Sequence, residues 1–131
     1  IDIIVVGTND TQNNYTASVS EAAAVQYVID LVDSAILNNS AGKIFVGLIP
    51  PDANGGATNA RVVSYNSALS TAIQAHANFN TTLFEFDLYT AFTNTDNCAT
   101  VAACMDVSGF HPNAAGYQIM SNTILTAILA H

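Results

Sequence analysis

The chain has 131 residues, of which 50% are hydrophobic and 9% are charged, a size and composition that suit one globular domain. Two basic residues against ten acidic ones give a formal net charge of -8, which argues against nucleic acids, anionic membrane surfaces and phosphate-rich ligands. No apolar run reaches the roughly 20 residues of a membrane span, and no charged region precedes an apolar stretch as in a signal peptide. Neutral substrates fit this charge balance better.

The start of the chain predicts a strand followed by a helix. Residues 1–6 form an apolar run, which predicts a strand buried on both faces, and residues 8–16 have the composition of a polar loop. Ser18 and Glu21 form a capping box, and the apolar residues that follow recur at helical spacing. We therefore expect a helix that ends at about Leu37.

The middle of the chain repeats this alternation. A second buried strand is expected over residues 43–49, and residues 52–59 have the composition of an exposed loop. A helix with one apolar face follows and ends near Ala77. Residues 82–88 then predict a third strand, and residues 93–104 an irregular connection.

An apolar helix closes the sequence and is expected to begin at Pro112 or Asn113, because proline pre-sets φ and lacks only an N–H that would be unpaired in the first turn. The order strand, helix, strand, helix, strand, loop, helix predicts right-handed crossovers and a parallel sheet. The expected fold class is α/β, with three layers (α/β/α) built from about three strands and three helices.

So thin a sheet leaves unpaired backbone at both edges unless another segment pairs with it. Three polar segments follow the strands, at residues 7–10, 50–56 and 87–111. Ligands bind outside the carboxyl ends of the strands in such sheets, so these segments mark the expected site.

Cys98 and Cys104, the only cysteines, favour a disulfide, since two cysteines without neighbouring ligands make a poor zinc site. We expect no metal and no cofactor. Glycosylation sequons begin at Asn14, Asn38 and Asn80, which supports a secreted protein, although such tripeptides also arise by chance in an asparagine-rich chain.

His111 stands on a loop directly before the last helix, where its imidazole can reach into a cleft and exchange protons near neutral pH. A capping or core histidine is the alternative. Asn9 follows Gly7 where the first strand ends, and its side-chain amide can donate to an oxyanion. An Asx-turn that merely ends the strand is the alternative for Asn9.

Together the two motifs, Ile3 to Asp10 and His111 to Tyr117, resemble the SGNH, or GDSL, hydrolase family. The match spans nearly the whole chain, and among the branches it looks most like secreted carbohydrate esterases that deacetylate xylan. The resemblance implies a flavodoxin-like sheet and a serine esterase. It also implies that Asn9, with Gly7 beside it, lies in the oxyanion hole, and that His111 is the general base.

The chain departs from the family pattern in two ways. No Gly-Asp-Ser block, which carries the family's nucleophile, precedes Ile1, so we expect residues 1–131 to be the C-terminal part of one hydrolase domain. The first strands and helices would then lie on a separate or missing segment. The position three residues before His111, usually aspartate, is Ser108. Asp106 either orients the imidazole from further back or is a solvated loop carboxylate, with a main-chain carbonyl completing a dyad.

The expected function is therefore hydrolysis of carboxylic esters, such as acetyl groups on a polysaccharide, with a nucleophile supplied by an N-terminal companion segment. The rival interpretation is a degenerate, non-catalytic protein of the same fold that binds carbohydrate or another partner. A plain flavodoxin-like ligand domain is disfavoured, because no phosphate-binding loop follows the first strand.

Overall fold

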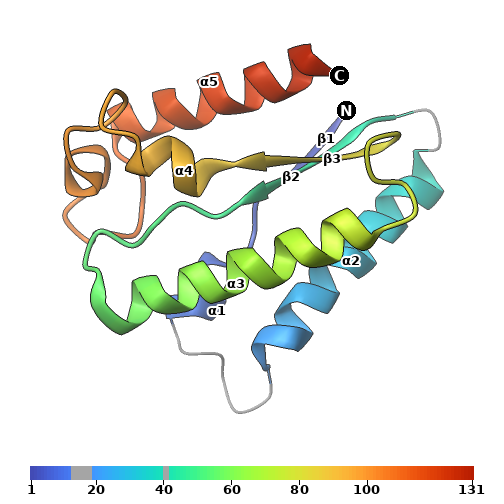
Figure 1. The fold of residues 1–131 in the computed structure, drawn as a ribbon, viewed down its shortest axis with the longest axis horizontal. Coiled ribbons are helices and arrows are strands. Elements are labelled where there is room, and N and C mark those ends of the chain that lie inside the picture. The colour runs from blue at the N-terminus through green and yellow to red at the C-terminus, as the bar shows by residue number, and fades with distance from the viewer. Residues whose placement is uncertain (13–18, 40–41) are drawn as a thin grey trace.

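The computed structural model describes residues 1–12, 19–39 and 42–131 (Figure 1). The apolar runs form three short strands, and helices connect them. In chain order the elements are β1 (Asp2–Ile4), α1 (Thr8–Gln12), α2 (Glu21–Asn38), β2 (Ile44–Leu48), α3 (Gly56–Ala75), β3 (Leu83–Asp87), α4 (Leu88–Thr93), the 3-10 helix η1 (Val101–Cys104) and α5 (Ala114–Ala130).

The three strands form one parallel sheet in the order β1-β2-β3. Ile44 at the start of β2 lies opposite Asp2 on one side and Leu83 on the other. Helices α2 and α3 cover one face and α5 covers the other (Figure 1). The predicted three-layer α/β arrangement is confirmed, and the described residues add two short helices, α1 and α4, to the three that we expected.

Each face of the sheet has its own apolar core. The larger core lies between the sheet and the pair α2 and α3, and its fully buried members include Val32, Ile44, Tyr65, Leu69, Ile73 and Leu83. The smaller core lies under α5 and contains Phe45, Phe84, Phe86 and Leu88. Burial of each such side chain contributes roughly 1.5–3 kcal/mol, so the two cores fix the three layers.

The expectation that the first strand is buried on both faces is wrong. Ile1 is 66% exposed, Ile3 47% and Val6 44%, and Ile4 is the buried residue of β1. β1 is an edge strand that pairs with β2 alone, and α5 packs against β3 at the other side of the sheet. The apolar run therefore forms an exposed hydrophobic surface, which none of the described residues buries.

The first third of the chain differs from the expectation in two ways: it contains an additional short helix, and the second helix has a different N-cap. α1 forms inside the predicted polar loop, where the Thr11 N–H donates to the Gly7 carbonyl at 3.1 Å. The N-cap of α2 is Ser20, whose hydroxyl accepts from the Ala23 N–H at 3.2 Å. Ser18 lies outside the described residues. The predicted capping box named only Ser18 and did not identify Ser20, the residue directly before the first helical residue, as the N-cap.

The predicted exposed loop at residues 52–59 is shorter and more buried than expected. α3 already begins at Gly56, and Asp52 is only 7% exposed. The Asp52 carboxylate accepts from the Asn54 N–H at 2.8 Å, and the Asn59 side chain accepts from the Asp52 N–H at 3.1 Å. These local bonds pair the backbone N–H groups of Asp52 and Asn54 with side chains of the same segment, which lets it fold back on itself.

The segment between β3 and the last helix is also more regular than predicted. Asp87 caps α4 by accepting from the Thr90 N–H at 2.9 Å, so its carboxylate is structural. Within the expected irregular connection, η1 is capped by Thr100. Short capped turns of this kind have too few residues to show an apolar period in the sequence.

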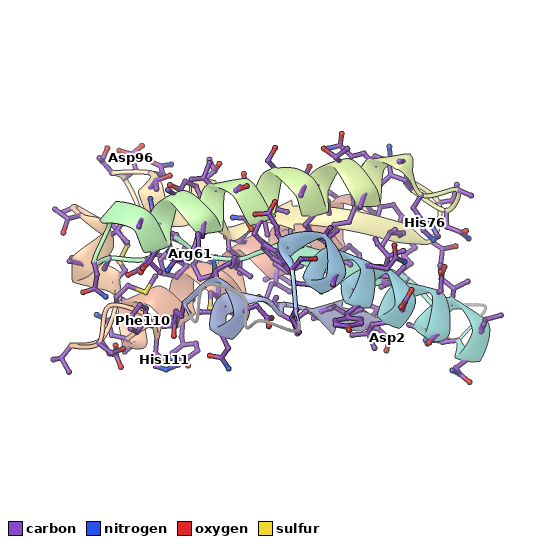
Figure 2. All side chains as sticks on the ribbon, turned by 90° about the horizontal axis from the view of Figure 1, so that it is seen from below. Asp2, Arg61, His76, Asp96, Phe110 and His111 are labelled. Carbon is purple, nitrogen blue, oxygen red and sulfur yellow. A yellow bond between two sulfur atoms is a disulfide. The ribbon has the colours of Figure 1, made fainter. Side chains whose placement is uncertain are left out.

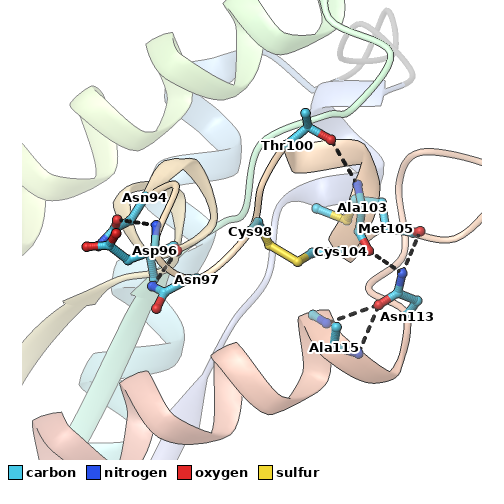
Figure 3. The surroundings of a disulfide bond; sticks show 12 residues. Asn94, Asp96, Asn97, Cys98, Thr100, Ala103, Cys104, Met105, Asn113 and Ala115 are labelled. Carbon is cyan, nitrogen blue, oxygen red and sulfur yellow. Dashed lines mark hydrogen bonds between the residues drawn. A yellow bond between two sulfur atoms is a disulfide. The ribbon is translucent and has the colours of Figure 1, made fainter.

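α5 begins at Ala114 and not at Pro112, because Asn113 is its N-cap. The Asn113 carbonyl oxygen Oδ1 accepts from the N–H groups of Ala115 and Gly116, at 2.9 and 3.2 Å. The Asn113 amide also donates to the carbonyls of Ala103 and Met105 (Figure 3). One side chain thus joins η1 to the start of α5.

The predicted disulfide between Cys98 and Cys104 is present and buried (Figure 3). Its Cα atoms lie 6.1 Å apart, and it closes the turn that contains η1. Phe92 and Ile119 pack beside it, so the bridge belongs to a third small core under the N-terminal end of α5. This core supports the loop that carries His111.

Candidate active site

A sharp turn at Gly7 places Asn9 at the carboxyl end of β1. Gly7 has φ of 117°, and a Cβ there would lie 2.5 Å from the ring of Tyr65, so both conformation and space require glycine. The Tyr65 hydroxyl donates to the Val6 carbonyl at 3.1 Å and fixes the turn from α3. Asn9 lies within α1 and is exposed, so the Asx-turn alternative is wrong.

A closed loop presents His111. Met105 and Pro112 form an antiparallel bridge, and the Asp106 N–H donates to the His111 carbonyl at 2.7 Å. Gly109, with φ of 76°, turns the chain between them. The loop is thus a miniature hairpin whose second arm ends at the imidazole.

The segment that follows β2 holds this loop in place. The Ala53 N–H donates to the Gly109 carbonyl at 3.0 Å, and the Asn54 side-chain amide donates to the Ser108 carbonyl at 2.8 Å. A Cβ on Gly109 would lie 2.5 Å from Asn54, so the two loops are in close contact. Two of the three polar segments predicted at the sheet edge therefore meet directly.

Asn9 and His111 line the same groove, of about 480 Å³. Figure 2 shows the His111 side chain beside the blue helix α1 and far from His76 at the opposite end of the molecule. The groove is bounded by Val5, Val6, Gly7, Thr8, Asn9, Asp10, Pro50, Phe110, His111, Pro112, Tyr117 and Met120. It thus combines an amide donor and an imidazole with largely apolar walls.

The carboxylate of Asp106 is engaged by Ser108. The Ser108 hydroxyl and N–H both donate to Asp106 Oδ1, the latter at 2.9 Å. The Ser108 hydroxyl is the main reason that the pKa of Asp106 lies below its usual range, and the nearby His111 charge lowers that pKa further. Among the residues described, none forms a hydrogen bond with the imidazole of His111.

These groups can accept a proton and donate to an oxyanion, but they do not include a serine. Thr8 and Tyr117 carry the hydroxyls that line the groove, and no serine of the described ranges does so. The same ranges contain no group of three histidine, cysteine, aspartate or glutamate residues placed to hold a metal ion. An imidazole and an amide donor in one groove are groups that acyl transfer can use.

Sequence reasoning missed the residues that support the site. Tyr65 lies on the apolar face of the helix predicted after residues 52–59, and that pattern does not show that its hydroxyl holds the Gly7 turn. Asn54 was assigned to an exposed loop, and Phe110 lines the groove beside His111. The run Asn54-Gly55-Gly56 indicates a turn, but nothing in the sequence shows which part of the fold that turn contacts.

The fold agrees with the comparison with known families. Residues 2–124 match the model of GDSL-like lipases and acylhydrolases. The chain belongs to this family. Members of the GDSL family are acylhydrolases, so the family assignment supports ester hydrolysis as a reaction class. No curated protein matches the chain.

Solved structures of GDSL proteins share the fold. A GDSL-like lipase from Bacteroides thetaiotaomicron superimposes with a TM-score of 0.74 at 22% identity, covering 98% of this chain and 61% of its own. A putative acylhydrolase from Bacteroides fragilis gives 0.70 at 23% identity, with 98% and 60% covered. A lipolytic protein of the G-D-S-L family from Veillonella parvula gives 0.68 at 20% identity, with 97% and 62% covered. The chain thus spans about three fifths of the length of these structures.

The features that bear on localisation are few. Asn38 and Asn80 are exposed, as an acceptor for glycosylation must be, and Asn14 lies outside the described residues. No helix in the part of the chain that the structure describes is long and apolar enough to cross a membrane. Glycosylation and secretion stay predictions.

Proposed function

We propose that this chain carries the base and the oxyanion donor of a serine esterase, and that a companion segment outside residues 1–131 supplies the nucleophile. The observation that carries the proposal is the shared groove. Asn9 and His111 are 102 positions apart in the sequence, yet both line it, with Gly7 beside Asn9. An imidazole and an amide donor facing one cavity are two of the three parts that acyl transfer needs.

The reaction follows from the roles of these groups. The serine oxygen attacks the ester carbonyl carbon while His111 accepts the serine proton, and the carbonyl oxygen becomes an oxyanion. The Asn9 amide and the Gly7 N–H donate to that oxyanion. The tetrahedral intermediate then expels the alcohol, which takes the proton from His111, and leaves an acyl-enzyme. Water, deprotonated by His111, attacks this ester, and release of the acid restores the serine.

Two features support a companion segment. No serine of the described residues lines the groove. One edge of β1 pairs with no other described strand, and the apolar side chains of Ile1 and Ile3 are exposed there. A parallel strand added to this edge would end next to Gly7, because the carboxyl ends of parallel strands meet at one edge of a sheet. A nucleophile just beyond such a strand would face the groove. The relatives' greater length is consistent with such a segment.

We further propose an acetylated polysaccharide as the substrate and secretion as the destination. The groove is open, and its polar groups are few, which suits a small acyl group on a neutral carrier. The net charge of -8 disfavours polyanionic substrates, and the exposed sequons at Asn38 and Asn80 suit an extracellular protein.

Hydrolysis of short p-nitrophenyl esters and of acetylated xylan by the natively purified protein tests the proposal. His111→Ala should lower kcat/KM by about 10²- to 10⁴-fold, the usual contribution of a general base. His76→Ala is the matched control, because His76 pairs with Asp33 at the far end of the molecule (Figure 2). Equal hydrolysis by the wild type and His111→Ala would reject the proposal.

The second candidate is a non-catalytic binding protein of the same fold, which the engagement of Asp106 by Ser108 favours. A fluorophosphonate probe separates the two candidates, because it labels only an activated nucleophile. Labelling of an associated polypeptide supports the esterase, and a native preparation that takes up no label supports the binding protein.

A further inference from the structure

Two residues that each have a buried polar atom without a partner among the described residues line one small cavity next to the groove. Asp52 is 7% exposed, and its Oδ2 accepts no hydrogen bond from any described residue. Gln12 Nε2 is buried in the same way and donates to none of them. Both residues line a cavity that also touches Thr8, Thr11, Pro50, Pro51, Thr58, Val62 and Phe110. Because an unpaired buried acceptor and an unpaired buried donor are each destabilising, their presence around one cavity points to a ligand that can bond to both.

The cavity has the size and the chemistry of a single water site. It offers about 10 Å³ of space for the centre of a water molecule, and one water needs about that much. Gln12 Nε2 supplies a donor and Asp52 Oδ2 an acceptor, and the threonine hydroxyls in the wall add further partners. A cation fits less well, because the unpaired atom of Gln12 is a hydrogen-bond donor, which cannot ligate a cation.

The cavity lies between the two halves of the candidate active site. Thr8, Pro50 and Phe110 line both the cavity and the groove that holds Asn9 and His111. Gln12 ends α1, the helix that carries Asn9. A bridge across the cavity would therefore tie that helix to the segment after β2.

Asp52 is already connected to the other half. Its Oδ1 accepts from the Asn54 N–H at 2.8 Å, and the Asn54 amide donates to the Ser108 carbonyl in the His111 loop. The neighbouring Ala53 N–H donates to Gly109 in the same loop at 3.0 Å. One oxygen of the Asp52 carboxylate is thus bonded to the segment that holds the His111 loop, while the other is unpaired in a residue that lines the cavity together with Gln12 of α1.

We propose that a buried water molecule bridges Gln12 Nε2 and Asp52 Oδ2, and that Asp52 is a positioning residue that sets Asn9 and His111 relative to each other. The water site stands on the cavity and its two unpaired atoms. The positioning role rests on the proposed function, in which Asn9 and His111 act together.

The water is tested by a crystal structure of the protein at a resolution that orders solvent. The expected result is a peak within hydrogen-bond distance of both Gln12 Nε2 and Asp52 Oδ2, about 2.7–3.2 Å from each. A direct bond between the two side chains, or a protein side chain in the cavity, would overturn the proposal. This readout is independent of any ester hydrolysis.

The positioning role is tested by NMR of the side-chain amide of Asn9 and the ring nitrogens of His111. Asp52→Asn keeps an oxygen for the Asn54 N–H but removes the acceptor in the cavity, and Gln12→Leu removes the donor. Both should shift the Asn9 signal and leave the His111 ring unchanged, whereas Asp52→Ala should shift both. The exposed Asp96→Asn is the control and should shift neither.

Asp52→Asn and Gln12→Leu keep the test decisive if Asp52→Ala does not fold. An Asn9 signal that stays in place in both would refute the positioning role. A water peak in the crystal structure, with no ester hydrolysis by a native preparation that includes any associated segment, would uphold the water bridge and reject the esterase, so the two failures are distinguishable.

Discussion

The Asp106 N–H donates to the His111 carbonyl at 2.7 Å, so backbone pairing brings these two residues together even though the Asp106 carboxylate is engaged elsewhere. Its Oδ1 accepts from the N–H and the hydroxyl of Ser108. The short loop between them therefore fixes the backbone position of His111. Substitution of Asp106 tests whether its carboxylate also orients the ring.

Asp106→Asn should reduce kcat/KM by less than about tenfold, because the carboxylate bonds to Ser108 and not to the imidazole; loss of a triad carboxylate by the same change costs about 10⁴-fold. Steady-state hydrolysis of a p-nitrophenyl ester measures this, with His111→Ala as the reference. A loss as large as that of His111→Ala would show that Asp106 turns to the ring and acts as the triad acid.

Ser108→Ala should raise the pKa of Asp106 toward its ordinary value, since the serine hydroxyl is the main cause of its lowering. A carboxyl with a lowered folded pKa stabilises the protein above its ordinary pKa, and this stability is lost as the pH falls through the lower value. The variant should lose that contribution at neutral pH. Carbon-13 NMR of the Asp106 carboxyl across an acid titration checks the direction, and an unchanged midpoint would contradict it.

Glu85 should make the protein less stable as the pH rises. Burial is the main cause of its raised pKa, the hydrogen bond from Ser70 opposes the shift, and Asp87 adds to it. Glu85 Oε2 is buried without a partner among the described residues. A carboxyl with a raised folded pKa binds its proton more tightly when folded. The stabilisation that Glu85 contributes to the folded protein is therefore complete below its ordinary pKa and is lost as the pH rises through the raised pKa.

Glu85→Gln should remove this dependence. Urea unfolding of the wild type and the variant, from pH of about 4 to about 8, should give curves that diverge as the pH rises, with the variant more stable at the upper end. Asp96→Asn on the surface is the matched control. Parallel curves would mean that Glu85 ionises in the folded state at no cost.

Gly7→Ala should be among the most damaging single substitutions. Its positive φ alone costs about 1–3 kcal/mol with a side chain, and the new Cβ would also lie 2.5 Å from the Tyr65 ring. We expect a loss of more than about 2 kcal/mol of stability together with displacement of Asn9. Gly55→Ala isolates the backbone strain, because Gly55 also has positive φ but open space at its Cβ position. Equal losses in chemical denaturation would show that Tyr65 gives way.

Replacing Cys98 and Cys104 by alanine should lower stability by about 2 kcal/mol, since the bridge closes a short segment. Hydrolysis should change much less than in His111→Ala, because Asn113 joins η1 to α5 by separate bonds to Ala103 and Met105 (Figure 3). Thermal unfolding and the ester assay, each compared with the wild type under reducing conditions, check both halves. A large kinetic loss would show that the bridge holds the imidazole.

The sequence predicted the elements whose apolar residues repeat. Continuous apolar runs predicted the strands at Ile44–Leu48 and Leu83–Asp87. Apolar residues at helical spacing predicted the three long helices, because such spacing marks a face packed against a core. Asn9 and His111 were found because each follows a strand or precedes a helix at one sheet edge. Their shared groove bears out the topology, and their chemical roles stay predictions.

What the sequence could not predict depends on contacts made across the fold. α1 and α4 are too short to show an apolar period, and the capping-box spacing of Ser18 and Glu21 did not identify Ser20 as the N-cap of α2. The exposure of Ile3 could not be inferred either, since an apolar run reads the same whether its cover belongs to this chain or to another segment. The polar residues that flank Asp52 predicted an exposed loop, and they do not show that Asp52 is buried by contacts across the fold.

The free edge of β1 makes stability a question of mass action. Any segment that pairs with the edge and covers Ile1 and Ile3 binds only the folded form, so it shifts the folding equilibrium in proportion to its concentration. The melting temperature of residues 1–131 would then have no single value. It would rise as the covering segment is added, and tethering that segment to the chain would hold the equilibrium at its saturated end.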